Sequence, residues 1–112
     1  MKPLKVMTVL GTRPEIIRLS RVMAALDKLV DHKIVHTGQN YDFELNEVFF
    51  EELGVRQPDH FLAVNTDSLG QTLGDILTKT EEVLLKEQPD AVLVLGDTNS
   101  AIATLLAKRM KI

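Results

Sequence analysis

The sequence predicts an α/β protein, a parallel sheet between helical layers in a three-layer, Rossmann-like arrangement. Two mostly apolar runs, 5–10 and 91–95, are each closed by a glycine and lack polar alternation, as is typical of strands buried on both faces. Segments with helical periodicity separate the strand-like runs along the whole chain. Because alternating strands and helices form parallel sheets with helices on both faces, these observations predict the fold class.

The individual elements follow from local signals. Pro14 suits the first turn of a helix, Gly54 predicts the end of the second helix, and Pro89 ends the third. The first helix carries a broad apolar face, which consists of Ile16, Ile17, Leu19, Val22, Met23, Leu26 and Leu29. In order, we expect strands at 5–10, 32–37, 60–64 and 91–95, and helices at 14–30, 41–53, 69–88 and 98–110.

Composition narrows the possible functions. Thirteen basic and sixteen acidic residues give a net charge of -3 with no block of like charge, which argues against a nucleic-acid surface. The chain has no cysteine, and its three histidines lack ligand spacing, so we predict no metal site. No secretion signal and no apolar run of about 20 residues is present. These features predict a cytoplasmic protein that does not insert into membranes.

The chain is long enough for one domain. Lys111 and Ile112 stand where a fifth strand would begin, so we expect residues 1–112 to be an incomplete N-terminal domain. A complete four-stranded domain is the alternative.

Topology indicates where the chemistry lies. In the usual strand order 3-2-1-4-5, ligands bind beyond the carboxyl ends of strands 1 and 4, where the order reverses. The flanking loops here are 11–15 (GTRPE) and 96–100 (GDTNS), and both place polar residues directly after apolar strands. We therefore expect the site at this edge.

Arg13 and Arg18 are the candidate anion-binding residues. A cation at a helix N-terminus is unfavourable by roughly 0.3–1 kcal/mol unless an anion also binds there. Arg18 lies one turn further along and can reach the same anion. The alternative pairs Arg18 with Glu15 at the surface and leaves Arg13 solvated.

Asp97 has two interpretations. Asp97 or Thr98 can serve as the N-cap of the final helix, and Asp97 can instead accept hydrogen bonds from substrate hydroxyls or act as an acid/base group. In the loop after the second strand, the polar residues Gln39, Asn40 and Asp42 are predicted mainly to cap the next helix.

At these loops the sequence resembles a known family. GTRPE at 11–15, TGQNYD at 37–42 and LGDTNS at 95–100 are similar to the N-terminal domain of UDP-N-acetylglucosamine 2-epimerases. The fold of these enzymes is similar to that of the two-domain, B-type glycosyltransferases. The resemblance implies that this chain is the N-terminal half of such an architecture, inactive without the second domain.

The resemblance also implies an activity, which is UDP-N-acetylhexosamine 2-epimerisation in the synthesis of cell-surface polysaccharides. UDP is eliminated to leave a 2-acetamidoglucal and then adds back with C2 inverted, with no metal or redox cofactor. Arg13 and Asp97 would contact the UDP-sugar substrate, and Asp97 would be catalytic. Arg18 would also bind substrate, at a position where better-known members carry lysine. A homodimer that associates through this domain is implied.

Two features leave the exact function open. Many bacterial members carry a Gln-His-Arg type sequence that binds an activating second substrate molecule, whereas residues 39–42 read QNYD here. TGQNYD and GTRPEIIRLS look more like the branch acting on UDP-N-acetyl-L-talosamine and L-fucosamine. The alternatives are a hydrolysing epimerase that releases UDP and N-acetylmannosamine, and a binding-only module.

Overall fold

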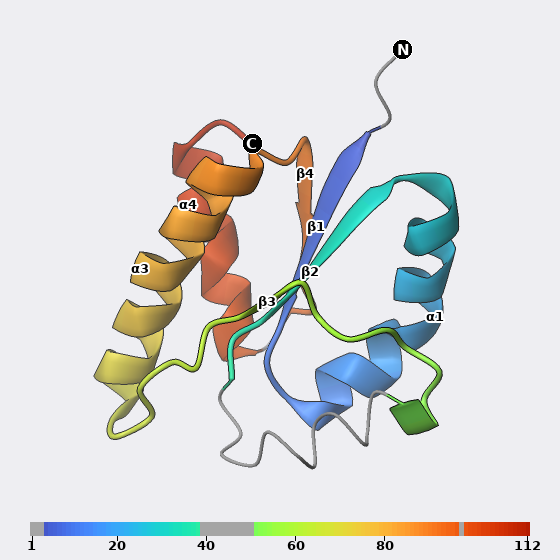
Figure 1. Ribbon diagram of the computed structural model, residues 1–112. Helices are drawn as coiled ribbons and strands as arrows, with labels where there is room; N and C mark the ends of the chain where they lie inside the picture. Colours follow the sequence, from blue (N-terminus) through green and yellow to red (C-terminus); the bar gives the residue numbers. More distant parts are fainter. Residues whose placement is uncertain (1–3, 39–50, 97) are drawn as a thin grey trace.

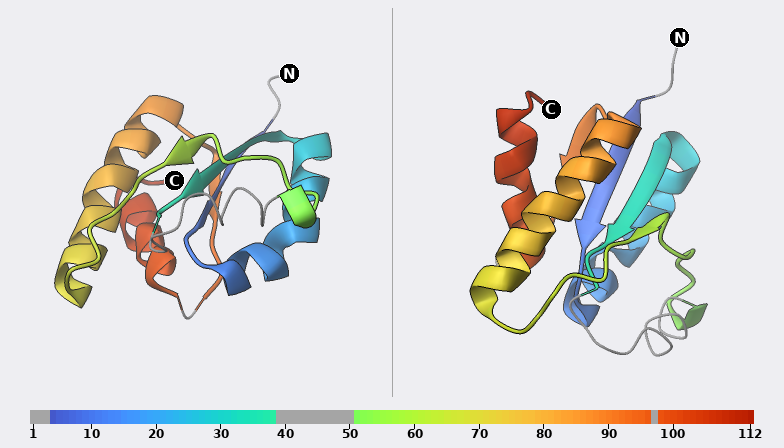
Figure 2. Two further views of the ribbon diagram at one scale, coloured as in Figure 1. Left: turned by 60° about the horizontal axis from the view of Figure 1, so that its bottom comes forward. Right: turned by 60° about the vertical axis from the view of Figure 1, so that its left-hand side comes forward.

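The computed structural model describes residues 4–38, 51–96 and 98–112, which form a parallel sheet between helices (Figure 1). The strand order is β3-β2-β1-β4, so the first and fourth strands are neighbours, as predicted. Helix α1 covers one face of the sheet, and α3 and α4 cover the other (Figure 2). The strands are β1 (Lys5–Leu10), β2 (Asp31–His36), β3 (His60–Phe61) and β4 (Ala91–Leu93); the helices are α1 (Arg13–Leu29), α3 (Leu69–Glu87), the 3₁₀ helix η1 (Asn99–Ile102) and α4 (Ala103–Arg109).

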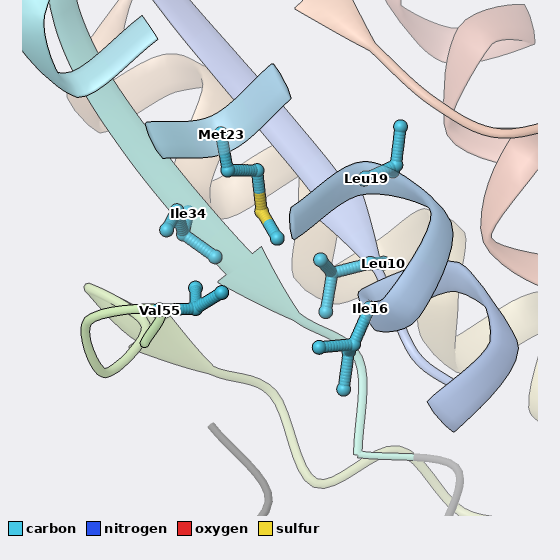
Figure 3. Packing of buried hydrophobic residues seen from close by; sticks show 6 residues of the cluster. All are labelled: Leu10, Ile16, Leu19, Met23, Ile34 and Val55. Carbon is cyan, nitrogen blue, oxygen red and sulfur yellow. The ribbon is translucent and has the colours of Figure 1, made fainter. Parts of the chain in front are cut away.

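Strand β1 is the centre of the sheet. It pairs along its whole length with β2, and its residues 6–8 pair with β4. Successive side chains of β1 supply two separate cores. The core under α1 contains Leu10, Ile16, Leu19, Met23, Ile34 and Val55 (Figure 3). The core under α3 and α4 contains Met7, Val9, Val35, Val83, Leu84 and Ala103.

Two predicted strands are shorter than their apolar runs. The run 60–64 predicts five strand residues, but β3 contains only two. Ala63 turns the chain with a positive φ of 50°, although the Val64 amide still donates to the Thr37 carbonyl at 3.0 Å. Strand β4 ends at Leu93 rather than at Leu95, and the final helix begins as the 3₁₀ turn η1.

Of the predicted second helix at 41–53, residues 41–50 lie outside the described residues. Residues 51–52 are helical, and Gly54 follows them in the left-handed conformation with φ 70°. The glycine predicted to end this helix has the backbone conformation that such an end requires.

The apolar face of α1 is narrower than predicted. Ile16, Leu19 and Met23 are buried, whereas Ile17 and Leu29 are 52% and 77% exposed. Neighbouring helical side chains diverge by about 100°, so Ile17 cannot face the sheet together with Ile16. Leu69, the first residue of α3, is likewise 65% exposed. Across the described ranges, no helix combines the length and apolar character that a membrane crossing requires.

A network of hydrogen-bonded polar side chains lies near the amino end of β2. The His32 ring lies 2.7 Å from Thr8 Oγ1 through Nε2 and 2.7 Å from Asp27 Oδ1 through Nδ1. The Arg56 guanidinium donates to Asp27, to Asp59 and to the His32 carbonyl. These contacts connect the C-terminal end of α1 to the start of β2. They lie at the other end of the strands from the candidate site.

Candidate functional site at the carboxyl ends of the strands

The chain leaves the carboxyl ends of three strands at the same edge of the sheet, in the lower half of Figure 1. These strands are β1, β2 and β4, which are adjacent in the sheet. The Thr37 amide donates to the Leu10 carbonyl at 2.8 Å, and Thr37 Oγ1 lies 3.4 Å from Ser100 Oγ. Residues far apart in the sequence are therefore neighbours here, as the predicted topology requires.

Arg13 is the first residue of α1, and its side chain is exposed at this edge. Arg18 is also exposed, one turn further along the helix. The alternative that pairs Arg18 with Glu15 at the surface is wrong, because Glu15 has no solvent exposure. Both guanidinium groups thus lie on the outside of the helix, near its N-terminus, where the positive end of the helix dipole favours an anion.

Glu15 is the residue that sequence reasoning missed. Its side chain is fully buried, and the Thr12 hydroxyl donates to its Oε1 at 3.0 Å. Burial raises the pKa of Glu15, while the nearby Thr12 hydroxyl and Gly11 amide partly offset this rise. The available signal was the spacing of Thr12 and Glu15, the T-x-x-E pattern of a capping box.

The loop after β4 contains Thr98 and Asp97. Thr98 precedes η1 in the extended conformation expected of an N-cap, yet its hydroxyl makes no capping bond. The hydroxyl instead donates back to the Leu95 carbonyl at 3.0 Å, so the alternative of a Thr98 side-chain cap is wrong. Asp97 lies outside the described residues, and both of its interpretations remain predictions.

The loop after β2 begins with a buried histidine. The Gly38 amide donates to His36 Nδ1 at 2.9 Å, and the ring stacks on Phe61 with centroids 5.0 Å apart. Burial lowers the pKa of His36 to about 4, and an accepting Nδ1 places the proton of the neutral ring on Nε2. Residues 39–42, predicted to cap the next helix, lie outside the described residues.

Gly38 is packed too closely for any side chain. Its φ is 78°, and an added Cβ would lie 2.9 Å from the backbone of Ala63. The glycine therefore lets the loop after β2 approach the loop after β3. Within the part of the chain that the structure describes, no group of three His, Cys, Asp or Glu residues is arranged to hold a metal ion.

Comparisons with known proteins place the chain in a family. The family model for UDP-N-acetylglucosamine 2-epimerase matches residues 24–112. The chain belongs to this family. The structure of UDP-N-acetylglucosamine 2-epimerase from Rickettsia bellii is 54% identical, with a TM-score of 0.89, over 98% of this chain and 29% of that one.

Two further members of the epimerase family bear on the ligand. The Methanocaldococcus jannaschii UDP-GlcNAc 2-epimerase, whose structure is in complex with UDP-GlcNAc and UDP, is 43% identical with a TM-score of 0.90, over 97% of this chain and 31% of that one. The Pseudomonas aeruginosa UDP-2,3-diacetamido-2,3-dideoxy-D-glucuronate 2-epimerase is 43% identical over 93% of this chain and 30% of its own length. This chain thus spans about 30% of the length of the relatives it matches.

Proposed function

We propose that residues 1–112 form the incomplete N-terminal domain of a non-hydrolysing 2-epimerase that acts on UDP-2-acetamido sugars. Membership of the epimerase family carries this proposal. Two family members at equal identity are named for different sugars, one for UDP-GlcNAc and one for a diacetamido glucuronate. The names share UDP and a sugar that is epimerised at C2 and bears an acetamido group, and this shared chemistry defines the substrate class.

The proposed reaction needs no group beyond side chains. A base removes the proton from C2, the bond between C1 and the phosphate oxygen breaks, and UDP leaves with the bonding electrons. Reversal with proton delivery to the other face of C2 gives the epimer. We assign Arg13 and Arg18 to the diphosphate, since guanidinium groups beside a helix N-terminus suit an anion. We assign Asp97 to acid/base work or to the sugar.

The site assignment is tested in the full-length protein. Arg13→Ala should weaken UDP and UDP-sugar binding together by about 1.5–3 kcal/mol, the range for a charged hydrogen bond. Asp97→Asn should leave UDP affinity unchanged and lower kcat. Arg21→Ala, an exposed arginine further along α1, is the control and should behave as wild type. Calorimetry measures the affinity for UDP and the UDP-sugar, and a turnover assay measures kcat. A near-wild-type affinity for Arg13→Ala together with a near-wild-type kcat for Asp97→Asn would overturn the assignment.

The reaction products identify the sugar that the enzyme uses and the type of reaction that it catalyses. Incubating the full-length protein with UDP-GlcNAc and with UDP-N-acetyl-L-fucosamine, followed by NMR, should show a C2 epimer that is still attached to UDP for one of them. Free N-acetylmannosamine and UDP would indicate a hydrolysing enzyme, and binding without conversion would indicate a binding-only module. We expect the activity in the cytoplasm, which cell fractionation tests.

A further inference from the structure

Charged side chains of α3 hold the turn that follows β3. Lys79 Nζ donates to the Leu62 carbonyl at 3.0 Å and to the Ala63 carbonyl at 3.1 Å. Asp75, one turn earlier on α3, accepts from the Asn65 amide at 2.8 Å and lies 3.6 Å from the same ammonium group. A cation thus meets two carbonyl oxygens and a carboxylate meets an amide, which is the polarity that each backbone group requires.

The other side of this turn lies against the end of β2. The Val64 amide donates to the Thr37 carbonyl at 3.0 Å, which continues the pairing of the two strands beyond β3. Beside this bond, a Cβ on Gly38 would lie 2.9 Å from the backbone of Ala63. The turn is therefore enclosed between α3 and the point where the chain leaves β2.

Ala63 has a backbone conformation that needs support from its surroundings. Its φ of 50° lies in the left-handed region, which alanine adopts at a conformational cost that glycine does not have. The Ala63 side chain is exposed, so packing of its methyl group does not offset this cost. Hydrogen bonds to the backbone around Ala63 do offset it, and two of them come from Lys79.

We propose that Lys79 is a positioning residue, which holds the turn at Ala63 against the end of β2 and so fixes the point from which the chain enters the loop after β2. This loop leaves the sheet at the edge of the candidate site. The Thr37 amide also donates to the carbonyl of Leu10, the last residue of β1, at 2.8 Å. The consequence for turnover rests on the proposed function, whereas the support of the turn does not.

Hydrogen–deuterium exchange in the full-length protein tests the support of the turn without reference to activity. Lys79→Met keeps an unbranched side chain and removes the ammonium group, so exchange of the amides of 62–65 should become at least about tenfold faster. Lys79→Arg retains charged donors and should give a smaller increase. Lys86→Met, at an exposed lysine two turns later in α3, is the control and should leave these amides unchanged. Unchanged exchange of 62–65 in Lys79→Met would overturn the proposal.

A second substitution separates this role from that of a surface ion pair between Lys79 and Asp75. In the Lys79→Met background, Ala63→Gly removes the conformational cost of the turn and should restore most of the protection of 62–65. If Lys79 only paired with Asp75, the added glycine would leave exchange as fast as in Lys79→Met or make it faster, because glycine is otherwise more flexible. That result would contradict the proposal.

Turnover of a UDP-sugar by the full-length protein tests the consequence for the site. Lys79→Met should lower kcat/KM at least about threefold, because a small displacement of a loop at the site slows the reaction. Adding Ala63→Gly should recover most of this loss, and Lys86→Met should behave as wild type. Circular dichroism checks that every variant is folded at the assay temperature.

The two measurements together decide the outcome. Faster exchange of 62–65 in Lys79→Met with an unchanged kcat/KM would overturn the positioning role. Should the wild-type protein convert no UDP-sugar, the proposed function would be wrong, and the exchange measurement alone would decide whether Lys79 holds the turn.

Discussion

At the scale of single residues, His36 shows how burial selects one protonation state. The ring is enclosed between the Gly38 amide and Phe61, and it has no solvent exposure. An imidazolium could not accept the hydrogen bond that Gly38 donates to Nδ1. The folded protein therefore favours the neutral ring, while the unfolded chain protonates His36 near its ordinary pKa of 6.5.

This difference predicts a pH dependence of stability. Between pH 6.5 and a folded-state pKa of about 4, the unfolded chain binds a proton at His36 that the folded protein does not bind. The stability present above pH 6.5 is therefore lost as the pH falls, by about 3 kcal/mol in total. Glu15, with its raised pKa, contributes the opposite slope, because its protonated form is favoured by folding.

The comparison of two variants isolates this contribution. His36→Gln removes the titration, so urea unfolding between pH 4 and 7 should show a flatter loss of stability than in wild type. His60→Gln changes a partly exposed histidine and retains His36, so it should keep the wild-type slope. Equal slopes for wild type and His36→Gln would show that His36 is not the group responsible.

At the scale of elements, we expect replacement of glycine by alanine to have opposite effects on stability at two positions. Gly38→Ala at the end of β2 would place a Cβ 2.9 Å from the Ala63 backbone at a positive φ, and should destabilise the fold by about 2–4 kcal/mol. Gly74→Ala in α3 meets nothing within 4 Å and should stabilise it by about 0.5–1 kcal/mol. Urea unfolding measures the free energy of unfolding of both variants. Similar effects of the two substitutions would contradict the close approach of Gly38 to the Ala63 backbone.

The strand order could be predicted from the sequence, whereas the burial of Glu15 and the length of β3 could not. The alternation of apolar runs with helical segments, together with the usual strand order of such sheets, predicted β1 beside β4, as the sheet shows. The burial of Glu15 was not predictable from one sequence, because a glutamate in the first turn of a helix is ordinarily exposed, and its burial depends on how the helix packs in the folded protein. The short β3 likewise depends on Ala63, which lies against Gly38 of another loop.

At the scale of the whole molecule, the layer formed by α3 and α4 carries exposed apolar surface. A groove of about 300 Å³ lies between these helices and is lined by Leu77, Thr78, Glu81, Leu105, Leu106 and Arg109. Leu85 and Leu105 are 60% and 58% exposed. Apolar surface that is rimmed by charged side chains is typical of protein contacts. We therefore propose this layer as the contact of the expected homodimer.

Light scattering of the full-length protein should give the mass of a dimer. In a two-fold interface each substitution occurs twice, so Leu105→Glu would bury two carboxylates without partners and should raise the dimer Kd at least about 100-fold. Leu29→Glu on α1, in the opposite layer, replaces a side chain that is 77% exposed and should leave the dimer intact. A monomeric wild-type protein would exclude the dimer. Dissociation by Leu29→Glu but not by Leu105→Glu would move the contact to the α1 layer.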